Sequence, residues 1–374
     1  MPGNLEANPI LAATKGRNNR KPLAHNDSWP PPSRPRAAEG RRSEPLTSAS
    51  ATRPTQPTID RGAGPAGALP SPDSGNHPIG KNVLMDSTEA SRTSLLVCQG
   101  RAVAHGRIAV GRFDDPTAWE MLHDDERRAV EGVRAGPPPK QWSSRVEYEM
   151  LRASGEVMVP RTVAIDDAIR EGGAQPVVIL GAGLDGRAWR MPELAGVEVF
   201  EVDHPASQTD KRHRVAGLIP TANALRFVPV DFTRDDLGAA LAGAGHDQTA
   251  ATTWIWEGVV PYLTRGQVEA TMRSVSTRSA PGSRLVVNYQ APSTVAALGR
   301  LAARAMSWTA RRRDPLAKEP RRSAWRPAEM AELLASQGFV VRHDRDLLTV
   351  AGGLGVEIRN HRSVGTGRVA VADR

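Results

Sequence analysis

The chain has 374 residues, of which 39% are hydrophobic and 24% charged, and this composition fits a soluble globular protein and argues against a fibrous one. Its net charge of +8 is unevenly placed, because residues 1–84 carry 11 Lys or Arg against 6 Asp or Glu. The excess lies mostly in that segment, so overall charge is a poor argument for a nucleic-acid surface, and we expect no nucleic-acid partner. No apolar run approaches the roughly 18 residues that span a bilayer, so we expect no membrane partner either.

Residues 1–84 differ from the rest of the chain in composition. They hold 14 of the 30 prolines and a single aromatic residue, Trp29, and cannot bury enough apolar surface to offset chain entropy. We predict that this Pro/Arg-rich segment is disordered, and hypothesise that translation starts at Met85. The first residues lack the apolar core of a signal peptide, and Cys98 has no partner for a disulfide or a structural metal site. The sequence therefore predicts a cytoplasmic protein without a metal.

Residues 88–172 are predicted to be a helical cap. Apolar positions at three-to-four spacing indicate helices over 94–110 and 116–133, with a stop at the Gly-Pro-Pro-Pro of 136–139. A third pattern contains Val146 and Leu151, and a fourth follows Pro160. No strand is expected before residue 176.

From residue 176 strands and helices alternate, which predicts an α/β fold with a mostly parallel seven-stranded sheet covered on both faces. The helix over 264–277 begins with the capping-box spacing of Thr264 and Gln267. The Rossmann-like core is predicted over 176–290 and 327–374, with a basic helical insertion at 294–325. The seven strands are predicted at 176–180, 197–202, 225–230, 252–256, 284–289, 339–342 and 367–371.

A glycine-rich turn follows the first predicted strand. Gly181 permits a tight turn, and Gly183 lets a ligand approach the backbone closely. The run fits G-x-G-x-x-G, a pattern that alone also fits an ordinary strand–helix turn with Asp185 as the helix cap.

Acidic residues follow the next three strands. Asp203 ends the second strand on the same face as Glu201, where a carboxylate can accept from ribose hydroxyls. Asp231 with Phe232 could hold an adenine after the third strand, and Glu257 follows the fourth. Parallel strands direct these groups to one edge, which predicts an adenosine cofactor without saying which one.

Several segments, in order over about residues 92–374, resemble the leucine carboxyl methyltransferase-like family, especially its bacterial branch of S-adenosylmethionine-dependent methyltransferases. One departure is Gly186, where the family usually has Ser or Thr. The resembling segments are 161–167 (RTVAIDD), 181–190 (GAGLDGRAWR), 201–205 (EVDHP), 230–232 (VDF), 256–263 (WEGVVPYL), 280–285 (APGSRL) and 367–370 (GRVA).

The resemblance implies a class I methyltransferase fold with an N-terminal helical extension and a helical lid insertion, and S-adenosylmethionine as cofactor. It places Gly181 and Gly183 under the methionine moiety and Asp203 on the ribose. It also implies that an arginine of the N-terminal helices meets the cofactor carboxylate, with Arg161 as first candidate and Arg145 as second. The remaining implied contacts are Asp231 and Phe232 on the adenine and Glu257 on the ammonium.

The predicted reaction is in-line transfer of a methyl group to an oxygen of a small molecule, either a carboxylate or a hydroxyl. A carboxylate needs no general base; for a hydroxyl, Tyr262, Tyr289 and His204 are candidates, each with an alternative structural role, so no catalytic base is assigned. We expect the acceptor pocket between the N-terminal helices and the insertion, whose aromatic residues include Trp325. Two alternatives stay open at this point, a nicotinamide-dependent oxidoreductase and a nucleic-acid methyltransferase or binding protein.

Overall fold

The computed structural model describes residues 92–292, 322–359 and 361–374, all within one structural unit, Ile79–Arg374. The segment 1–84 with its predicted disorder, the proposed start at Met85, and most of the predicted lid insertion lie outside the described residues.

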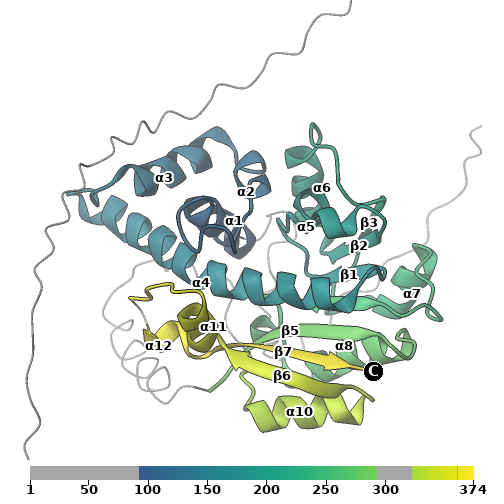
Figure 1. Ribbon diagram of the computed structural model, residues 1–374. Helices are drawn as coiled ribbons and strands as arrows, with labels where there is room; N and C mark the ends of the chain where they lie inside the picture. Colours follow the sequence, from purple (N-terminus) through teal and green to yellow (C-terminus); the bar gives the residue numbers. More distant parts are fainter. Residues whose placement is uncertain (1–91, 293–321, 360) are drawn as a thin grey trace, which may run out of the picture. The chain divides into compact units, whose positions relative to one another are not determined.

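The centre of the unit is a seven-stranded sheet with the order β3-β2-β1-β4-β5-β7-β6 (Figure 1). β1 to β5 run parallel, while β7 pairs antiparallel with both β5 and β6. All seven predicted strands are present and the predicted mostly parallel sheet is confirmed. The strands are β1 (Val177–Leu180), β2 (Glu198–Asp203), β3 (Ala224–Pro229), β4 (Thr253–Trp256), β5 (Arg284–Gln290), β6 (Val340–Asp346) and β7 (Gly367–Asp373).

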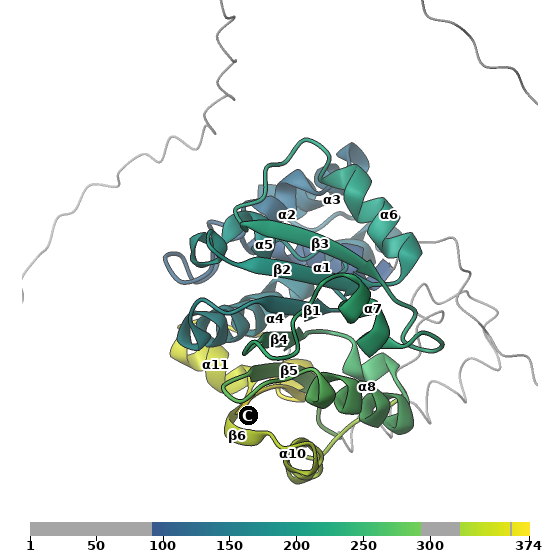
Figure 2. The ribbon, with the colours of Figure 1, turned by 90° about the vertical axis from the view of Figure 1, so that its right-hand side faces the viewer.

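Helices cover both faces of the sheet (Figure 2). One face packs on α7 (Leu237–Gly243), α8 (Arg265–Thr277) and α10 (Pro327–Ser336). The other face packs on α4 (Trp142–Gly172) and α11 (Leu347–Gly353). The shorter elements are α5 (Arg187–Arg190), η1 (Pro192–Leu194), α6 (Pro205–Arg214), η2 (Val260–Tyr262) and α12 (His361–Val364).

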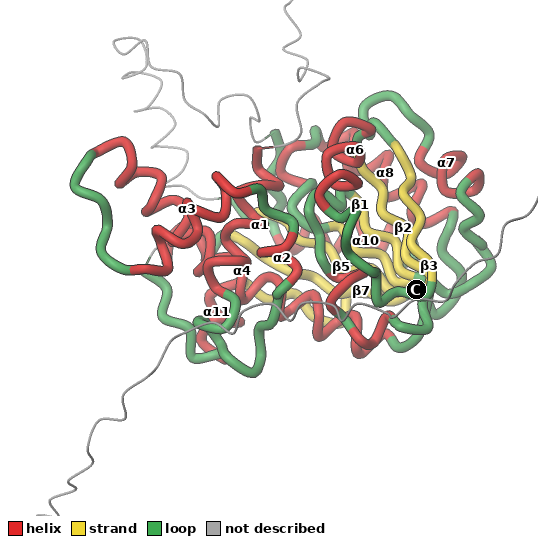
Figure 3. Tube along the Cα trace, turned by 90° about the horizontal axis from the view of Figure 1, so that it is seen from above, coloured by secondary structure: helices red, strands yellow, loops and turns green. Residues whose placement is uncertain are grey.

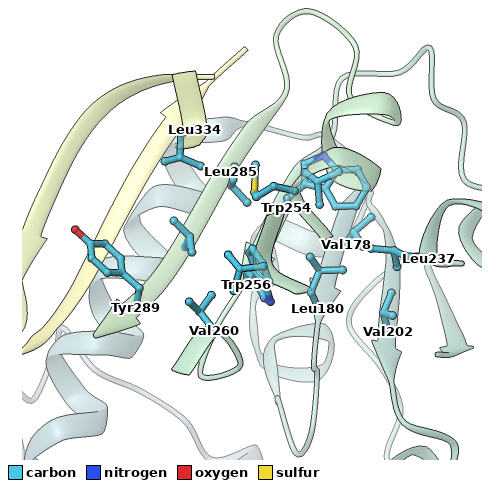
Figure 4. Close-up of a cluster of buried hydrophobic side chains, with 14 of the residues drawn as sticks. Val178, Leu180, Val202, Leu237, Trp254, Trp256, Val260, Leu285, Tyr289 and Leu334 are labelled. Atoms are coloured by element: carbon cyan, nitrogen blue, oxygen red, sulfur yellow. The ribbon is translucent and has the colours of Figure 1, made fainter. Parts of the chain in front are cut away.

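Buried strands form the core between these layers (Figure 4). Every residue of β1 and of β4 is buried, as expected for the central strands of a sheet that is covered twice. Trp254 and Trp256 are fully buried on the α8 side, beside Leu180 and Leu285. The carboxyl ends of β1 and β4 are therefore held rigidly side by side, and the loops that follow them inherit that placement.

The helices before β1 differ from the expected ones in three places, the first being that the helix expected over 94–110 ends at Ala104. The helix expected over 116–133 is two helices, because α2 (Thr117–Glu120) ends before His123, and α3 (Asp124–Ala135) starts there with its own capping box to Glu126. α1 (Arg92–Ala104), α2 and α3 gather along α4 (Figure 3).

The third and fourth expected helices are one helix, α4, which continues through Pro160. A proline inside a helix removes one backbone hydrogen bond but is tolerated where tertiary packing holds both halves. Here the residues around Pro160 are buried, and the C-terminal half of α4 packs on the sheet through Ile165 and Ile169. α4 therefore belongs to the cap at one end and to a layer of the core at the other.

Candidate functional site

The turn after β1 is built on two glycines with positive φ, +69° at Gly181 and +46° at Gly183. A Cβ on Gly181 would lie 2.1 Å from Cγ2 of Val259, and a Cβ on Gly183 would lie 2.9 Å from the Cβ of Ser94. The turn is thus squeezed between the loop after β4 and the start of α1. Only glycine fits both the backbone conformation and this close approach.

Asp203, the last residue of β2, closes on this turn. Its Oδ2 accepts a hydrogen bond of 2.5 Å from the amide of Gly183, and its Oδ1 accepts one of 2.6 Å from the amide of His204. Burial raises the pKa of Asp203, and these two amides oppose the rise. The carboxylate is therefore fixed in direction at the carboxyl end of β2, next to the glycine turn, where the sequence predicted a ribose-binding acid.

Glu201 has a different environment from Asp203, although both were predicted on one face. It is fully buried, with its Oε2 2.6 Å from Nζ of Lys211 on α6. Burial raises the pKa of Glu201 to about 7, and the ammonium of Lys211 opposes the rise. Glu201 thus forms a fully buried ion pair with Lys211, although neither of its oxygens has a hydrogen bond of good geometry among the described residues.

Asp231 and Phe232 follow β3 as predicted. The Oδ1 of Asp231 accepts hydrogen bonds from the amide and the hydroxyl of Thr233, and its Oδ2 lies 2.7 Å from Nη2 of Arg234. Burial raises the pKa of Asp231, but these hydrogen bonds and Arg234 outweigh it and leave the pKa below its usual value. Phe232 packs against the core cluster on the α8 side. The carboxylate is thus turned into its own loop, and its contact with an adenine stays a prediction.

Glu257 and Arg161 meet each other, although the sequence placed them only on the same ligand. Arg161 Nε lies 2.7 Å from Glu257 Oε1, and both side chains are about nine-tenths buried. Neither atom has a hydrogen-bond partner of good geometry among the described residues. The pair is attracted through charge, yet both groups keep the capacity to bind a ligand.

A further set of buried charges was missed by the sequence reasoning. Arg187 contacts three carboxylates, those of Asp166, Asp185 and Glu257. Arg190 also pairs with Asp166, at 2.8 Å. The sequence did contain a signal, because charged residues in 161–167 and 181–190 stand among apolar neighbours. Burial could not be known before the cap was placed over them.

The other sequence candidates have structural roles or lie apart. Arg145 is exposed near the start of α4. His204 caps α6, since its Nδ1 accepts a hydrogen bond of 3.2 Å from the amide of Ala206. Tyr289 is fully buried and its hydroxyl donates to Asp344.

Trp325 was expected in the insertion over the acceptor. It is instead 3% exposed and part of the core on the α8 side, with its Nε1 donating to the hydroxyl of Ser323. Its amide also donates to the carbonyl of Gln290 at the end of β5. Trp325 therefore belongs to the core and is not available to cover a ligand.

Gly186 lies at the N-terminus of α5 and faces the cap. A Cβ there would lie 3.0 Å from the Cβ of Thr117 and 3.2 Å from Oδ1 of Asp115. A side chain at this position would thus begin in contact with Thr117 and Asp115. Across the described ranges, no helix is long and apolar enough to cross a membrane, and no cluster of three or more metal-ligating side chains is found there.

The family model "Leucine carboxyl methyltransferase" matches residues 94–276. A protein of Mycobacterium sp. (strain JLS), named "Putative S-adenosyl-L-methionine-dependent methyltransferase", is 38% identical over 218 residues, which cover 57% of this chain and 70% of the relative. One of the same name from Mycobacteroides abscessus is 34% identical over 53% of this chain and 66% of the relative, just under two thirds of its length.

The chain belongs to the leucine carboxyl methyltransferase family of S-adenosylmethionine-dependent methyltransferases. The strand order and the antiparallel β7 are those of the class I methyltransferase fold, so this predicted fold is confirmed. Family membership also decides the cofactor in favour of S-adenosylmethionine over a nicotinamide. Among solved structures, one named "putative methyltransferase from Thermobifida fusca" aligns with a TM-score of 0.46 and 14% identity, over 78% of this chain and 97% of that one.

The described residues fit this cofactor. The methionine moiety of S-adenosylmethionine carries an ammonium and a carboxylate, and Arg161 with Glu257 offers one buried group of each opposite sign. One atom of each group, Arg161 Nε and Glu257 Oε1, also lacks a directed hydrogen bond among the described residues, as expected where a ligand supplies it. Asp203 stands at the end of β2 with its carboxylate already oriented. These residues lie at the carboxyl edge of the sheet, where open α/β folds bind their ligands.

Proposed function

We propose that this methyltransferase transfers the methyl group to an oxygen of a small molecule, with a carboxylate as the preferred acceptor. The observation that carries the cofactor-binding part of the proposal is the Arg161–Glu257 pair after β4. In this proposal Arg161 binds the cofactor carboxylate, Glu257 its ammonium and Asp203 the ribose hydroxyls, while Gly181 and Gly183 lie beneath the methionine moiety. The adenine lies against Asp231 and Phe232.

The nature of the acceptor follows from what the transfer requires. The cofactor supplies an electrophilic methyl group on a sulfonium, so the protein needs to align a nucleophile and exclude water. A carboxylate is ionised near neutral pH and attacks without losing a proton, whereas a hydroxyl must be deprotonated by a base. Two of the three candidate bases, His204 and Tyr289, are engaged in structural hydrogen bonds. This supports a carboxylate, as does the carboxyl acceptor in the name of the family model.

The test uses the full-length protein and deuteromethyl-labelled S-adenosylmethionine. It is incubated with a panel of small carboxylic acids and a matched panel of phenols and alcohols, and methylated products are detected by mass spectrometry. Mild alkali then distinguishes the products, because methyl esters are hydrolysed and methyl ethers are not. We expect base-labile products that require Asp203, and thus are missing with Asp203→Ala. Base-stable products alone would replace the carboxylate by a hydroxyl acceptor.

A further inference from the structure

Arg187 is the most heavily engaged side chain near the proposed cofactor site. It is 2% exposed, with Nε 2.7 Å from Oδ1 of Asp166 and Nη1 2.7 Å from Oε2 of Glu257. Nη1 also pairs with Oδ2 of Asp185, whose Oδ1 accepts a hydrogen bond from the amide of Arg187. One guanidinium thus joins α4, the turn after β1 and the end of β4.

The three acids around Arg187 have different roles. Asp166 is fixed from a second side by Arg190, and Asp185 is fixed by the backbone amide of Arg187 itself. Glu257 is held by arginines alone, with Arg187 on one oxygen and Arg161 on the other. Asp166 and Asp185 therefore fix the guanidinium of Arg187, and the guanidinium in turn holds the carboxylate of Glu257 in position.

The two arginines on Glu257 also differ from each other. Arg161 is the more exposed, at 10% against 2%, and its Nη1 approaches within 3.8 Å of the position of a Cβ on Gly258. Arg161 has one acidic partner among the described residues, whereas Arg187 has three. If Arg161 turns to a ligand carboxylate, Arg187 is the contact that Glu257 retains.

Arg187 also helps to keep Glu257 ionised, together with Arg161. Burial alone would raise the pKa of this carboxyl, but Arg161 and Arg187 outweigh burial and hold the pKa well below its usual range. A carboxylate that is to bind an ammonium must be both ionised and correctly oriented.

We propose that Arg187 is a positioning residue of the cofactor site: anchored by Asp166 and Asp185, it holds the Glu257 carboxylate in the place where it receives the ammonium of the methionine moiety. This inference rests on the proposed binding role of Glu257. It assigns to Arg187 a contribution that acts on the amino-acid end of the cofactor and leaves the adenosine end unchanged.

Two ligands separate these ends in a calorimetric experiment on the full-length protein. S-adenosylhomocysteine carries the amino-acid group, and 5′-methylthioadenosine lacks it. With Arg187→Lys, which keeps one charge but cannot bridge three carboxylates, we expect about tenfold weaker binding of S-adenosylhomocysteine and a change within about twofold for 5′-methylthioadenosine. The matched control is Arg214→Lys, another buried arginine between two acids, Glu126 and Asp210, which should alter neither.

Equal losses for both ligands, or no loss for S-adenosylhomocysteine, would overturn the proposal. In the Glu257→Gln background Arg187→Lys should add little further loss, because the group it positions is gone. If Arg187→Lys does not unfold cooperatively, Asp166→Asn decides in its place by removing one anchor, with about threefold selective weakening expected. A failure of the proposed binding role of Glu257 is recognised separately, since Glu257→Gln alone would then leave the binding of S-adenosylhomocysteine unchanged.

Discussion

The two ends of β4 each carry a buried polar cluster, and the clusters differ in how completely they are satisfied. At the amino end, His246 Nε2 lies 3.1 Å from the hydroxyl of Thr252, its Nδ1 accepts from Arg278 at 3.3 Å, and Ser283 accepts from the amide of Thr252 at 3.0 Å. At the carboxyl end, Glu257 is surrounded by full charges and keeps an oxygen without a directed hydrogen bond among the described residues.

The difference indicates what each cluster is for. A polar group buried in a core normally finds all its partners, because an unmet group costs free energy. The amino-end cluster follows that rule and ties the loops before β4 and β5 together. The carboxyl-end cluster departs from it at the edge where parallel sheets bind ligands. The cluster at the amino end of β4 therefore stabilises the fold, whereas the cluster at its carboxyl end keeps groups that can bind a ligand.

The largest effect is expected at the glycine turn of the carboxyl end. Gly181→Ala combines an unfavourable positive φ with a Cβ 2.1 Å from Val259, so we expect the free energy of unfolding to fall by about 3 kcal/mol in urea denaturation. Gly282, in the turn before β5, has a φ of +86° but its Cβ position is 3.6 Å from Ala251. Gly282→Ala should therefore cost only about 1 kcal/mol.

The steric part of that cost can be tested directly. Gly181→Ala combined with Val259→Ala removes the clash but keeps the strained backbone. The free energy of unfolding that Gly181→Ala loses beyond the loss in Gly282→Ala should therefore become smaller in the double variant. If the double variant is no more stable than Gly181→Ala alone, crowding by Val259 is not the cause.

The second prediction concerns binding at the carboxyl end. Glu257→Gln removes the charge that we assign to the cofactor ammonium, and we expect S-adenosylhomocysteine to bind about a hundredfold more weakly, equivalent to about 3 kcal/mol. Asp373→Asn is the matched control at the opposite edge, because Asp373 also lies between two arginines, Arg284 and Arg342. Calorimetry should show unchanged binding for the control. Equal weakening by both variants would mean that the loss reflects general destabilisation.

The third prediction concerns pH and the amino end. Burial first, and Arg278 second, lower the pKa of His246 to about 4. The unfolded chain takes up a proton near pH 6.5 while the folded imidazole stays neutral, so stability from this group is full above pH 6.5 and is lost as the pH falls toward 4. We expect the unaltered protein to lose about 2 kcal/mol more than His246→Gln between pH 7 and pH 4.5 in urea denaturation. Parallel pH profiles for the two proteins would contradict this assignment.

The sheet could be predicted from sequence because its signals are local. The central strands are short apolar runs bounded by glycine or proline, as with Val177–Leu180 before Gly181. The start of α8 is likewise marked locally, by the capping box of Thr264 and Gln267. The continuity of α4 through Pro160 could not be predicted, since it depends on burial against elements distant in the chain. The local rule for proline was overridden by tertiary packing.

The candidate site shows the same division. Gly181, Gly183 and Asp203 were found from their spacing after buried strands, and the structure brings them together through the Gly183–Asp203 hydrogen bond. The contacts of Arg187 could not be found this way, because they join α4, α5 and the end of β4. A charge in a sequence does not reveal whether it is buried or which partner it meets.

The smallest effect is expected at Gly186, where the family usually has Ser or Thr. The position faces Thr117 and Asp115 of the cap, and its φ of −102° suits any residue. Gly186→Ser should therefore bind S-adenosylhomocysteine within about twofold of the unaltered protein. Because its Cβ would lie 3.0 Å from that of Thr117, α2 has to shift by a few tenths of an ångström, and we expect the free energy of unfolding to fall by about 1 kcal/mol. Gly186→Ala separates the added carbon from the hydroxyl. If Gly186→Ser but not Gly186→Ala strengthens binding by about tenfold, the hydroxyl reaches the cofactor. Residue 186 would then belong to the cofactor site and not to the contact with the cap.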